Sequence, residues 1–142
     1  MSFRSDVRAA LVTRLEAVKA ANPTALRKVY LARPAAIAEH PVAWVGTITE
    51  RFQHTSGVRT RLPGTVATVI IATILTDNAE TLTKVDDAAG LVIDDLTANY
   101  HALSSDTVIE PIGSESVEIP YGDTAYPGVE ITVSIIEASG RT

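Results

Sequence analysis

Apolar side chains recur at helical spacing near the start of the chain. Residues 5–21 predict a helix, because side chains three and four positions apart share one face. Asn22 and Pro23 end the pattern, since proline cannot continue a helix. The apolar stripe consists of Phe3, Val7, Leu11, Leu15 and Val18.

The stretch from Thr65 to Leu75 is a run of β-forming residues that is apolar on both faces. Val and Ile fit a crowded, pleated surface, and such a strand lies inside a sheet with something packed on each face. A helix can cover one face, and a partner subunit is a candidate for the other. The two faces carry Val66, Ile70 and Ile74 on one side, and Val69, Ile71 and Leu75 on the other.

A second helix follows this strand, with Asp77 or Asn78 as its expected cap. We expect both helices to pack side by side on the same sheet. Gly90 in the middle marks either a close backbone contact or a tolerated glycine. The apolar stripe of this helix is Leu82, Val85, Ala89, Val92 and Leu96.

The remaining strands are shorter or less regular. Strands are expected at 27–32, at 44–52 and, with clear alternation, at 129–135. Extended segments at 107–112 and 117–119 end at or contain proline, which indicates an edge or irregular strand. Residues 53–64 are expected to form a long hairpin loop, because Gly57 and the pair Pro63-Gly64 favour turns.

Composition bounds the class of protein. The 142 residues are 46% hydrophobic and 20% charged, which is typical of one folded domain spanning residues 1–142. There is no cysteine, and no apolar run reaches the ~18 residues of a membrane span. The first residues lack the apolar centre of a signal peptide.

Charge is distributed unevenly along the chain, whose net charge is −5. Residues 1–61 hold ten Lys or Arg and four Asp or Glu, whereas residues 62–142 hold two and thirteen. Such polarity suits head-to-tail contacts between copies, although the charges can equally cancel within one domain. The acidic total argues against a dedicated nucleic-acid binder.

The sequence predicts no catalytic, cofactor or metal site. Common nucleotide, hydrolase and metalloprotease motifs are absent, and His40, His54 and His101 lack the spacing of metal ligands. A serine, histidine and aspartate triad stays open, since it is recognised by geometry alone. We therefore predict that the chain is not an enzyme.

Two charged groups are candidate contact residues. The expected hairpin loop and its base carry Arg51, His54, Arg59 and Arg61, either solvated or in contact with a neighbour. The outer positions of the second helix carry Asp86, Asp87, Asp94 and Asp95, either as a solvated face or as an acidic surface with an electrostatic role.

The order of elements resembles the tail terminator (tail completion) proteins of long-tailed bacteriophages. The resemblance spans nearly the whole chain and lies in the first helix around residues 7–11, the strand-to-helix unit 69–96 and the ending 126–133. It implies an α+β fold of two layers: a mixed, mostly antiparallel sheet with two main helices on one face and a long β-hairpin.

The same resemblance implies a homo-oligomeric ring, expected to be a hexamer, that caps the tail tube and ends its polymerisation. Its partners would be further copies of the chain, the tail tube protein and the head–tail connector protein. DNA would pass through the hole without specific binding, and no cofactor or membrane is implied. The protein would belong to the virion, with the host cytoplasm as its place of assembly.

Within this interpretation, Arg51, His54, Arg59 and Arg61 would contact a neighbouring subunit or the tube. Some of the four aspartates would face the lumen, where negative charge keeps DNA from sticking. Two alternatives stay open. The first is a phage connector or neck protein. The second is a small cytosolic α+β enzyme or ligand-binding domain with a pocket near Trp44, Tyr100 and His101.

Overall fold

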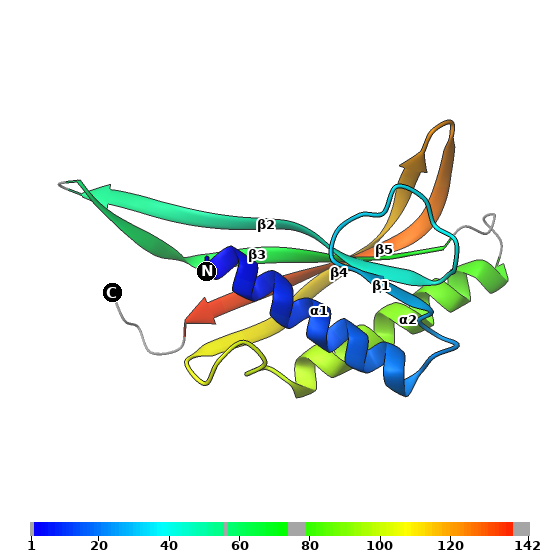
Figure 1. Ribbon diagram of the computed structural model, residues 1–142, viewed down its shortest axis with the longest axis horizontal. Helices are drawn as coiled ribbons and strands as arrows, with labels where there is room; N and C mark the ends of the chain where they lie inside the picture. The colour runs from blue at the N-terminus through cyan, green and yellow to red at the C-terminus, as the bar shows by residue number, and fades with distance from the viewer. Residues whose placement is uncertain (1, 56, 74–78, 138–142) are drawn as a thin grey trace.

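Five strands form one sheet, and two helices pack on one of its faces (Figure 1). The computed structural model describes residues 2–55, 57–73 and 79–137. The strand order is β1-β2-β3-β5-β4; β1 and β2 are parallel, and the other neighbours are antiparallel. This two-layer α+β arrangement confirms the expected fold class. The elements are α1 (Phe3–Ala21), β1 (Lys28–Tyr30), β2 (Val42–Thr55), β3 (Val58–Ala72), α2 (Ala79–Ala98), β4 (Thr107–Tyr121) and β5 (Thr124–Glu137).

The core lies between the helices and the inner face of the sheet. Helix α1 covers β1 and β2, while α2 covers β3, β4 and β5. The predicted stripe of α1 is buried apart from Phe3, which is partly buried at the edge of the core. Strand β5 presents its alternate apolar side chains to the helices, as its pattern predicted. These are Val129, Ile131, Val133 and Ile135.

The stripe of α2 differs from the prediction at its first position. Leu82 was expected to be buried but is 41% exposed, and Thr81 takes the buried place one residue earlier. Both residues lie within one turn of Val85, so spacing alone does not choose between them. A carbon built at Gly90 would meet nothing within 4 Å outside its own turn, so this glycine is tolerated rather than required. The expected cap, Asp77 or Asn78, lies outside the described residues, as do Ile74 and Leu75.

The expected loop at residues 53–64 is instead a continuation of the hairpin strands. Thr55 pairs directly with Val58, and Gly57 adopts a φ of 79° in the turn. Pro63 and Gly64 fall beside a register shift between β2 and β3, where a φ of 100° at Gly64 accommodates the irregularity. The prediction of a loop was therefore wrong, because a bulge absorbs the two turn-forming residues.

Strand β4 also runs further than its sequence indicated. The expected break at Pro111 is a register shift between Pro111 and Gly113, and pairing with β5 continues to Tyr121. The strand lies at the edge of the sheet, as its prolines indicated. Within the described ranges, neither helix is long and apolar enough to cross a membrane.

Candidate assembly surfaces

The most prominent feature is a two-stranded ribbon that projects beyond the body of the molecule (Figure 1). The pairing of β3 with β5 ends at Thr65 and Ile135, whereas β2 and β3 remain paired out to Thr55 and Val58. We call residues 51–55 and 58–64 the arm. In the described part of the chain, its two strands pair only with each other, so the arm has open edges that another chain can meet.

Side chains of α1 hold the arm at its root. Arg4 donates a hydrogen bond to the carbonyl of Ile48, and its Nε lies 3.4 Å from a carboxylate oxygen of Glu50. The Glu50 side chain is only 8% exposed, so this ion pair is better shielded from water than a fully exposed pair. The start of the arm is therefore fixed to the helical layer.

The predicted contact residues belong to the arm. Arg51 is exposed at its base. His54 pairs with Arg59 along the backbone, and Phe52 pairs with Arg61; the side chains of His54, Arg59 and Arg61 lie outside what the structure describes. The backbone thus brings the four predicted residues onto one projecting ribbon rather than a loop. Val58, near the tip, is 63% exposed.

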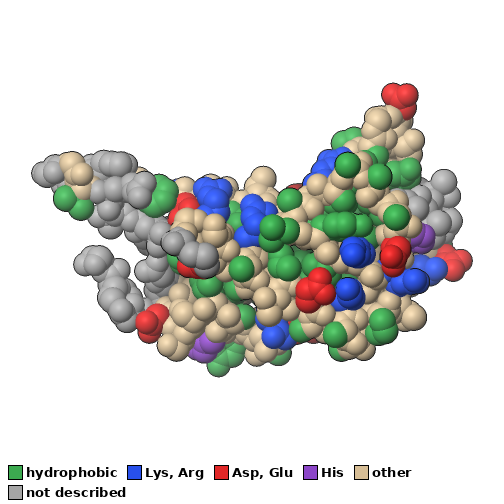
Figure 2. Space-filling model, viewed as in Figure 1, with side chains coloured by type: hydrophobic (Ala, Val, Ile, Leu, Met, Phe, Trp, Pro, Cys, Tyr) green, Lys and Arg blue, Asp and Glu red, His purple; other side chains and the backbone are tan. Residues whose placement is uncertain are grey.

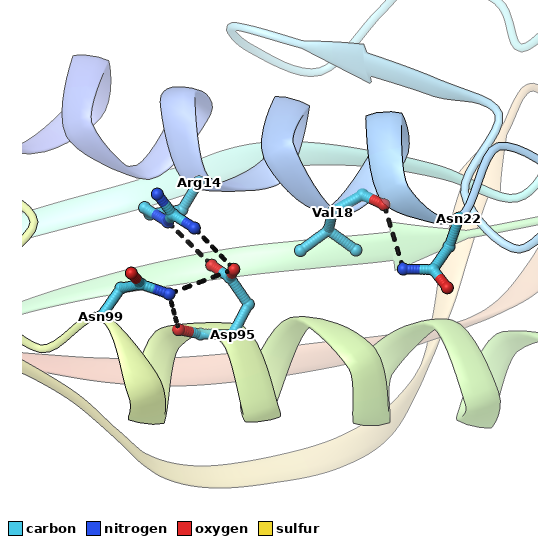
Figure 3. A network of polar contacts seen from close by, with 5 residues as sticks. All are labelled: Arg14, Val18, Asn22, Asp95 and Asn99. Atoms are coloured by element: carbon cyan, nitrogen blue, oxygen red, sulfur yellow. Dashed lines mark hydrogen bonds and ion pairs between the residues drawn. The ribbon is translucent and has the colours of Figure 1, made fainter.

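The four aspartates of α2 do not form one surface. Asp86, Asp87 and Asp94 are exposed, but Asp95 faces α1 and receives two hydrogen bonds from Arg14, of 2.7 and 2.9 Å (Figure 3). The prediction that Asp95 lies on the outer side of the helix was wrong. Its carboxylate instead forms an ion pair with Arg14 of α1.

The Arg14–Asp95 contact is a bidentate, charge-assisted pair at the seam between the helices. Hydrogen bonding to Asp95 raises the pKa of Arg14 above its ordinary value, against the opposing effect of burial. Asn99 adds a donor 3.3 Å from the same carboxylate and closes the end of α2 on the carbonyl of Asp95. Asn22 closes the end of α1 in the same way, on the carbonyl of Val18 (Figure 3).

At one end, the second face of the sheet is covered by the chain itself. Beyond β1, residues 31–41 cross this face and meet the raised end of the β4–β5 hairpin (Figure 1). Tyr121 donates a 2.9 Å hydrogen bond to the carbonyl of Pro34, and the Arg33 guanidinium lies 4.3 Å from the centre of the Tyr121 ring. Arg33 also donates to the carbonyl of Pro120. Trp44 lies beneath these contacts, and its side chain is only 3% exposed.

Next to this cover lies an open groove of about 420 Å³. Its apolar lining includes Trp44, Ile70, Val117 and Ile119, while Thr68 and Glu130 add polar groups. Hydrophobic side chains gather in this region below the raised hairpin end (Figure 2). We call this surface the Trp44 groove.

A second hollow, of about 620 Å³, lies between residues 38–41 and α2 and is lined by both signs of charge. His40, Arg27 and Lys84 border it together with Glu39 and Asp87. Burial lowers the pKa of His40, and the positive charges of Lys84 and Arg27 lower it further. The neutral imidazole is therefore favoured in the folded protein.

The pocket expected near Trp44, Tyr100 and His101 does not exist as one site. Trp44 packs on the face of the sheet away from the helices, whereas Tyr100 and His101 border a separate hollow beside α1. His101 contacts the carbonyl of Thr107 at 3.1 Å, a local contact within its own loop. Across the described residues, no three His, Cys, Asp or Glu side chains gather closely enough to hold a metal ion.

No family model matches this sequence, and no curated protein matches it either. The sequence had pointed to the charged arm but not to the Trp44 groove. Arg33 and Tyr121 are far apart along the chain, and no local pattern pairs them. The one indication in the sequence was that residues 65–75 are apolar on both faces, which predicts that the second face of the sheet is also covered.

Proposed function

We propose that this chain is a ring-forming structural protein that caps the tail tube of a long-tailed bacteriophage. The observation that carries the proposal is the arm, an extended ribbon anchored by Arg4 and Glu50 and projecting beyond the two-layer body. A ribbon whose two strands pair only with each other contributes little to a monomer's core, and it offers both backbone edges and side chains to a neighbour.

The uneven charge supports assembly as well. The arm carries three arginines in its sequence, and β4 carries the exposed glutamates Glu110, Glu115 and Glu118. Contacts between unlike surfaces of identical subunits propagate around a ring when the rotation closes. In the proposed ring, one face meets the tail tube protein and stops its polymerisation, and the other meets the head connector.

DNA passes through the central hole in this proposal without base recognition. The exposed Asp86, Asp87 and Asp94 are the candidates for a lumen surface that repels the phosphate backbone. Asp95 is withdrawn from that set because its carboxylate is held by Arg14. A neck or connector protein of the same phages is the second candidate, because an arm that joins copies of the chain into a ring suits that role as well.

The proposal is tested on tail tubes polymerised from the tube protein encoded in the same genome. With this chain added, we expect electron micrographs to show rings at tube ends and a shorter, narrower distribution of tube lengths. Rings that bind connector complexes but never tube ends would favour the neck protein. A chain that forms no ring and leaves tube lengths unchanged would contradict both.

A shortened arm supplies the matched control. Replacing residues 51–64 by a two-residue Asn-Gly turn removes the ribbon, and this turn type suits antiparallel strands. The residues removed pair only with one another in the described structure, so the body should keep its helices and melting behaviour. We expect this variant to fold and to lose ring formation and tube capping.

A further inference from the structure

The Trp44 groove and the arm have complementary properties. The groove has an apolar floor with Glu130 at its side, and Glu115 is the direct cross-strand partner of Glu130. Val129 and Ile131 face the helices, so alternation places Glu130, and with it Glu115, on the open face. The arm offers the opposite charge, with Arg51 exposed at its base and Arg59 and Arg61 in its second strand.

The two glutamates form an unfavourable pair in the isolated subunit. Like charges directly opposite each other in antiparallel strands are destabilising. Among the described residues, neither Glu115 nor Glu130 makes an ion pair. A cation brought to this place would relieve the repulsion and gain two carboxylate partners.

The arm cannot reach the groove of its own subunit. Trp44 and Thr55 belong to the same strand, and eleven residues of strand span about 36 Å at ~3.3 Å per residue. The arm runs away from the groove, toward the end of the molecule opposite the raised β4–β5 hairpin (Figure 1). Basic side chains lie near the root of the arm, and an acidic side chain lies at the raised tip (Figure 2).

We propose that the arm of one subunit binds the Trp44 groove of the next copy of this chain, with its arginines against Glu115 and Glu130. The occupant of the groove is thus a second copy, chosen by charge complementarity and by the opposite placement of the two surfaces.

The contact joins two different surfaces, so a pair of subunits still has one free groove, on the first subunit, and one free arm, on the second. Such a heterologous contact continues from copy to copy and closes into a ring when the rotation allows. The inference rests on the proposed ring and adds to it the surface that receives the arm. The cover made by Arg33 and Tyr121 then has a role, because it fixes one wall of the groove.

Charge reversal tests the contact in both directions. One variant combines Arg59→Glu with Arg61→Glu and reverses the arm; the other combines Glu115→Lys with Glu130→Lys and reverses the groove. Each alone places like charges together, and we expect the protein concentration at half-assembly to rise at least tenfold, measured by light scattering. The equimolar mixture should recover rings, because each arm then meets a groove of opposite charge.

A control variant makes the same change of net charge elsewhere. Glu16→Lys with Glu80→Lys matches the +4 change of the groove variant at exposed positions of α1 and α2, away from both surfaces, and should leave the assembly concentration within about twofold. If both reversed variants assemble like the unchanged chain, the arm-to-groove contact is overturned while the proposed ring survives. Failure of the mixture to recover assembly also overturns the contact.

Cross-linking gives an independent measurement, because the chain has no cysteine of its own. Val58→Cys places a thiol near the arm tip, and Thr47→Cys places one at the exposed lining of the groove. With a short bismaleimide, the double variant should form a ladder of oligomers, and each single variant at most a dimer. If rings form but the double variant gives no ladder, the arm-to-groove contact is overturned and the proposed ring is not. If the unchanged chain stays monomeric both in solution and in the presence of tail tubes, the proposed function is overturned as well.

Discussion

Asp94 and Asp95 are neighbours in the chain with different surroundings, and this contrast defines the role of the helix–helix ion pair. Asp94 is exposed, whereas the Asp95 side chain is 17% exposed and receives both hydrogen bonds from Arg14. Partial shielding and bidentate geometry make this pair stronger than a fully exposed one. It ties α1 to α2 across 81 residues of sequence.

Asp95→Asn is expected to lower the free energy of unfolding by about 1–2 kcal/mol. The reason is that Arg14 loses its charged partner at a site where both side chains are largely shielded from water. Asp94→Asn is the matched control and should change it by no more than about 0.5 kcal/mol. Urea denaturation of the two variants and the unchanged protein measures the difference. Equal effects from both changes would show that the pair has no special weight.

His40 gives the protein a pH-dependent stability. Its pKa is lower in the folded state than the ordinary 6.5, so the unfolded chain binds the proton more readily. The stabilising contribution is fully present above pH 6.5 and is lost as the pH falls through the lower folded pKa. We expect His40→Gln to flatten the fall in unfolding free energy between about pH 7.5 and 5.5.

Lys84→Met is the companion test of the cause. Removing one of the two positive charges near His40 should return part of its pKa toward the ordinary value and reduce the same slope partially. Thermal melting at a series of pH values measures both variants. An unchanged slope in His40→Gln would assign the pH dependence to other groups.

At this scale, the sequence predicted residue types better than their partners. The α1 stripe was correct because four of its five members lie at unambiguous helical spacing and are fully buried. Leu82 was wrong because Thr81 satisfies the same spacing, and the rotation of a helix about its axis is settled by packing. Asp95 was wrong because Arg14 belongs to a different helix, and pairing across the core leaves no local signal.

Among the elements, two glycines of α2 and β5 show how differently the same residue is used. A carbon at Gly128 would lie 2.4 Å from the Ile119 side chain and 2.6 Å from the backbone oxygen of Ile71. A carbon at Gly90 would have open space. Strand β5 therefore needs glycine where it passes between β3 and β4, and α2 does not.

Gly128→Ala is expected to destabilise the protein by about 1–3 kcal/mol, since the Ile71 backbone cannot withdraw without breaking the register. Gly90→Ala should stabilise it by up to about 1 kcal/mol, because alanine is the better helix former. The two melting temperatures should move in opposite directions. An unchanged melting temperature in Gly128→Ala would show that the neighbouring strands shift to accommodate the added carbon.

Helices and alternating strands were recognisable from their periods, but the arm and the long β4 were not. Pro63-Gly64 and Pro111 carry ordinary break signals. The structure accommodates each beside a register shift, at places where one side of the strand lacks a partner or lies at the sheet edge. Whether a bulge forms depends on the partner strand. A local sequence pattern does not show which strand that is, so it cannot predict the bulge.

For the whole molecule, the distribution of charge leads to a prediction about salt. If arm and groove meet through Arg59, Arg61 and Glu130, raising the ionic strength from about 0.15 to 1 M shortens the screening length from ~8 to ~3 Å and should weaken assembly. Sedimentation at fixed protein concentration should show rings giving way to monomers. Assembly strengthened by salt would point to an apolar contact instead.

The fold class could be predicted because two helical stripes and several strand patterns leave few ways to build layers. The surfaces could not, because the groove combines Arg33 and Trp44 from the first third of the chain with Ile119 and Glu130 from the last. Only the sheet order brings them together. Charge asymmetry between the two halves was visible in the sequence, but not which surfaces carry it.

The sheet order also determines how the chain must fold. The β2–β3 and β4–β5 hairpins each close over a short turn, so both can form early and independently. Joining β3 to β5 brings Thr65 beside Ile135 and encloses α2 and β4 in one long loop, whose closure entropy is repaid only when the core is buried. We therefore expect the seam between these two strands to form late in folding. Because β3 is the central strand and Ala67, Val69 and Ile71 are fully buried, their amides should be among the last to exchange with solvent hydrogen once the protein is folded.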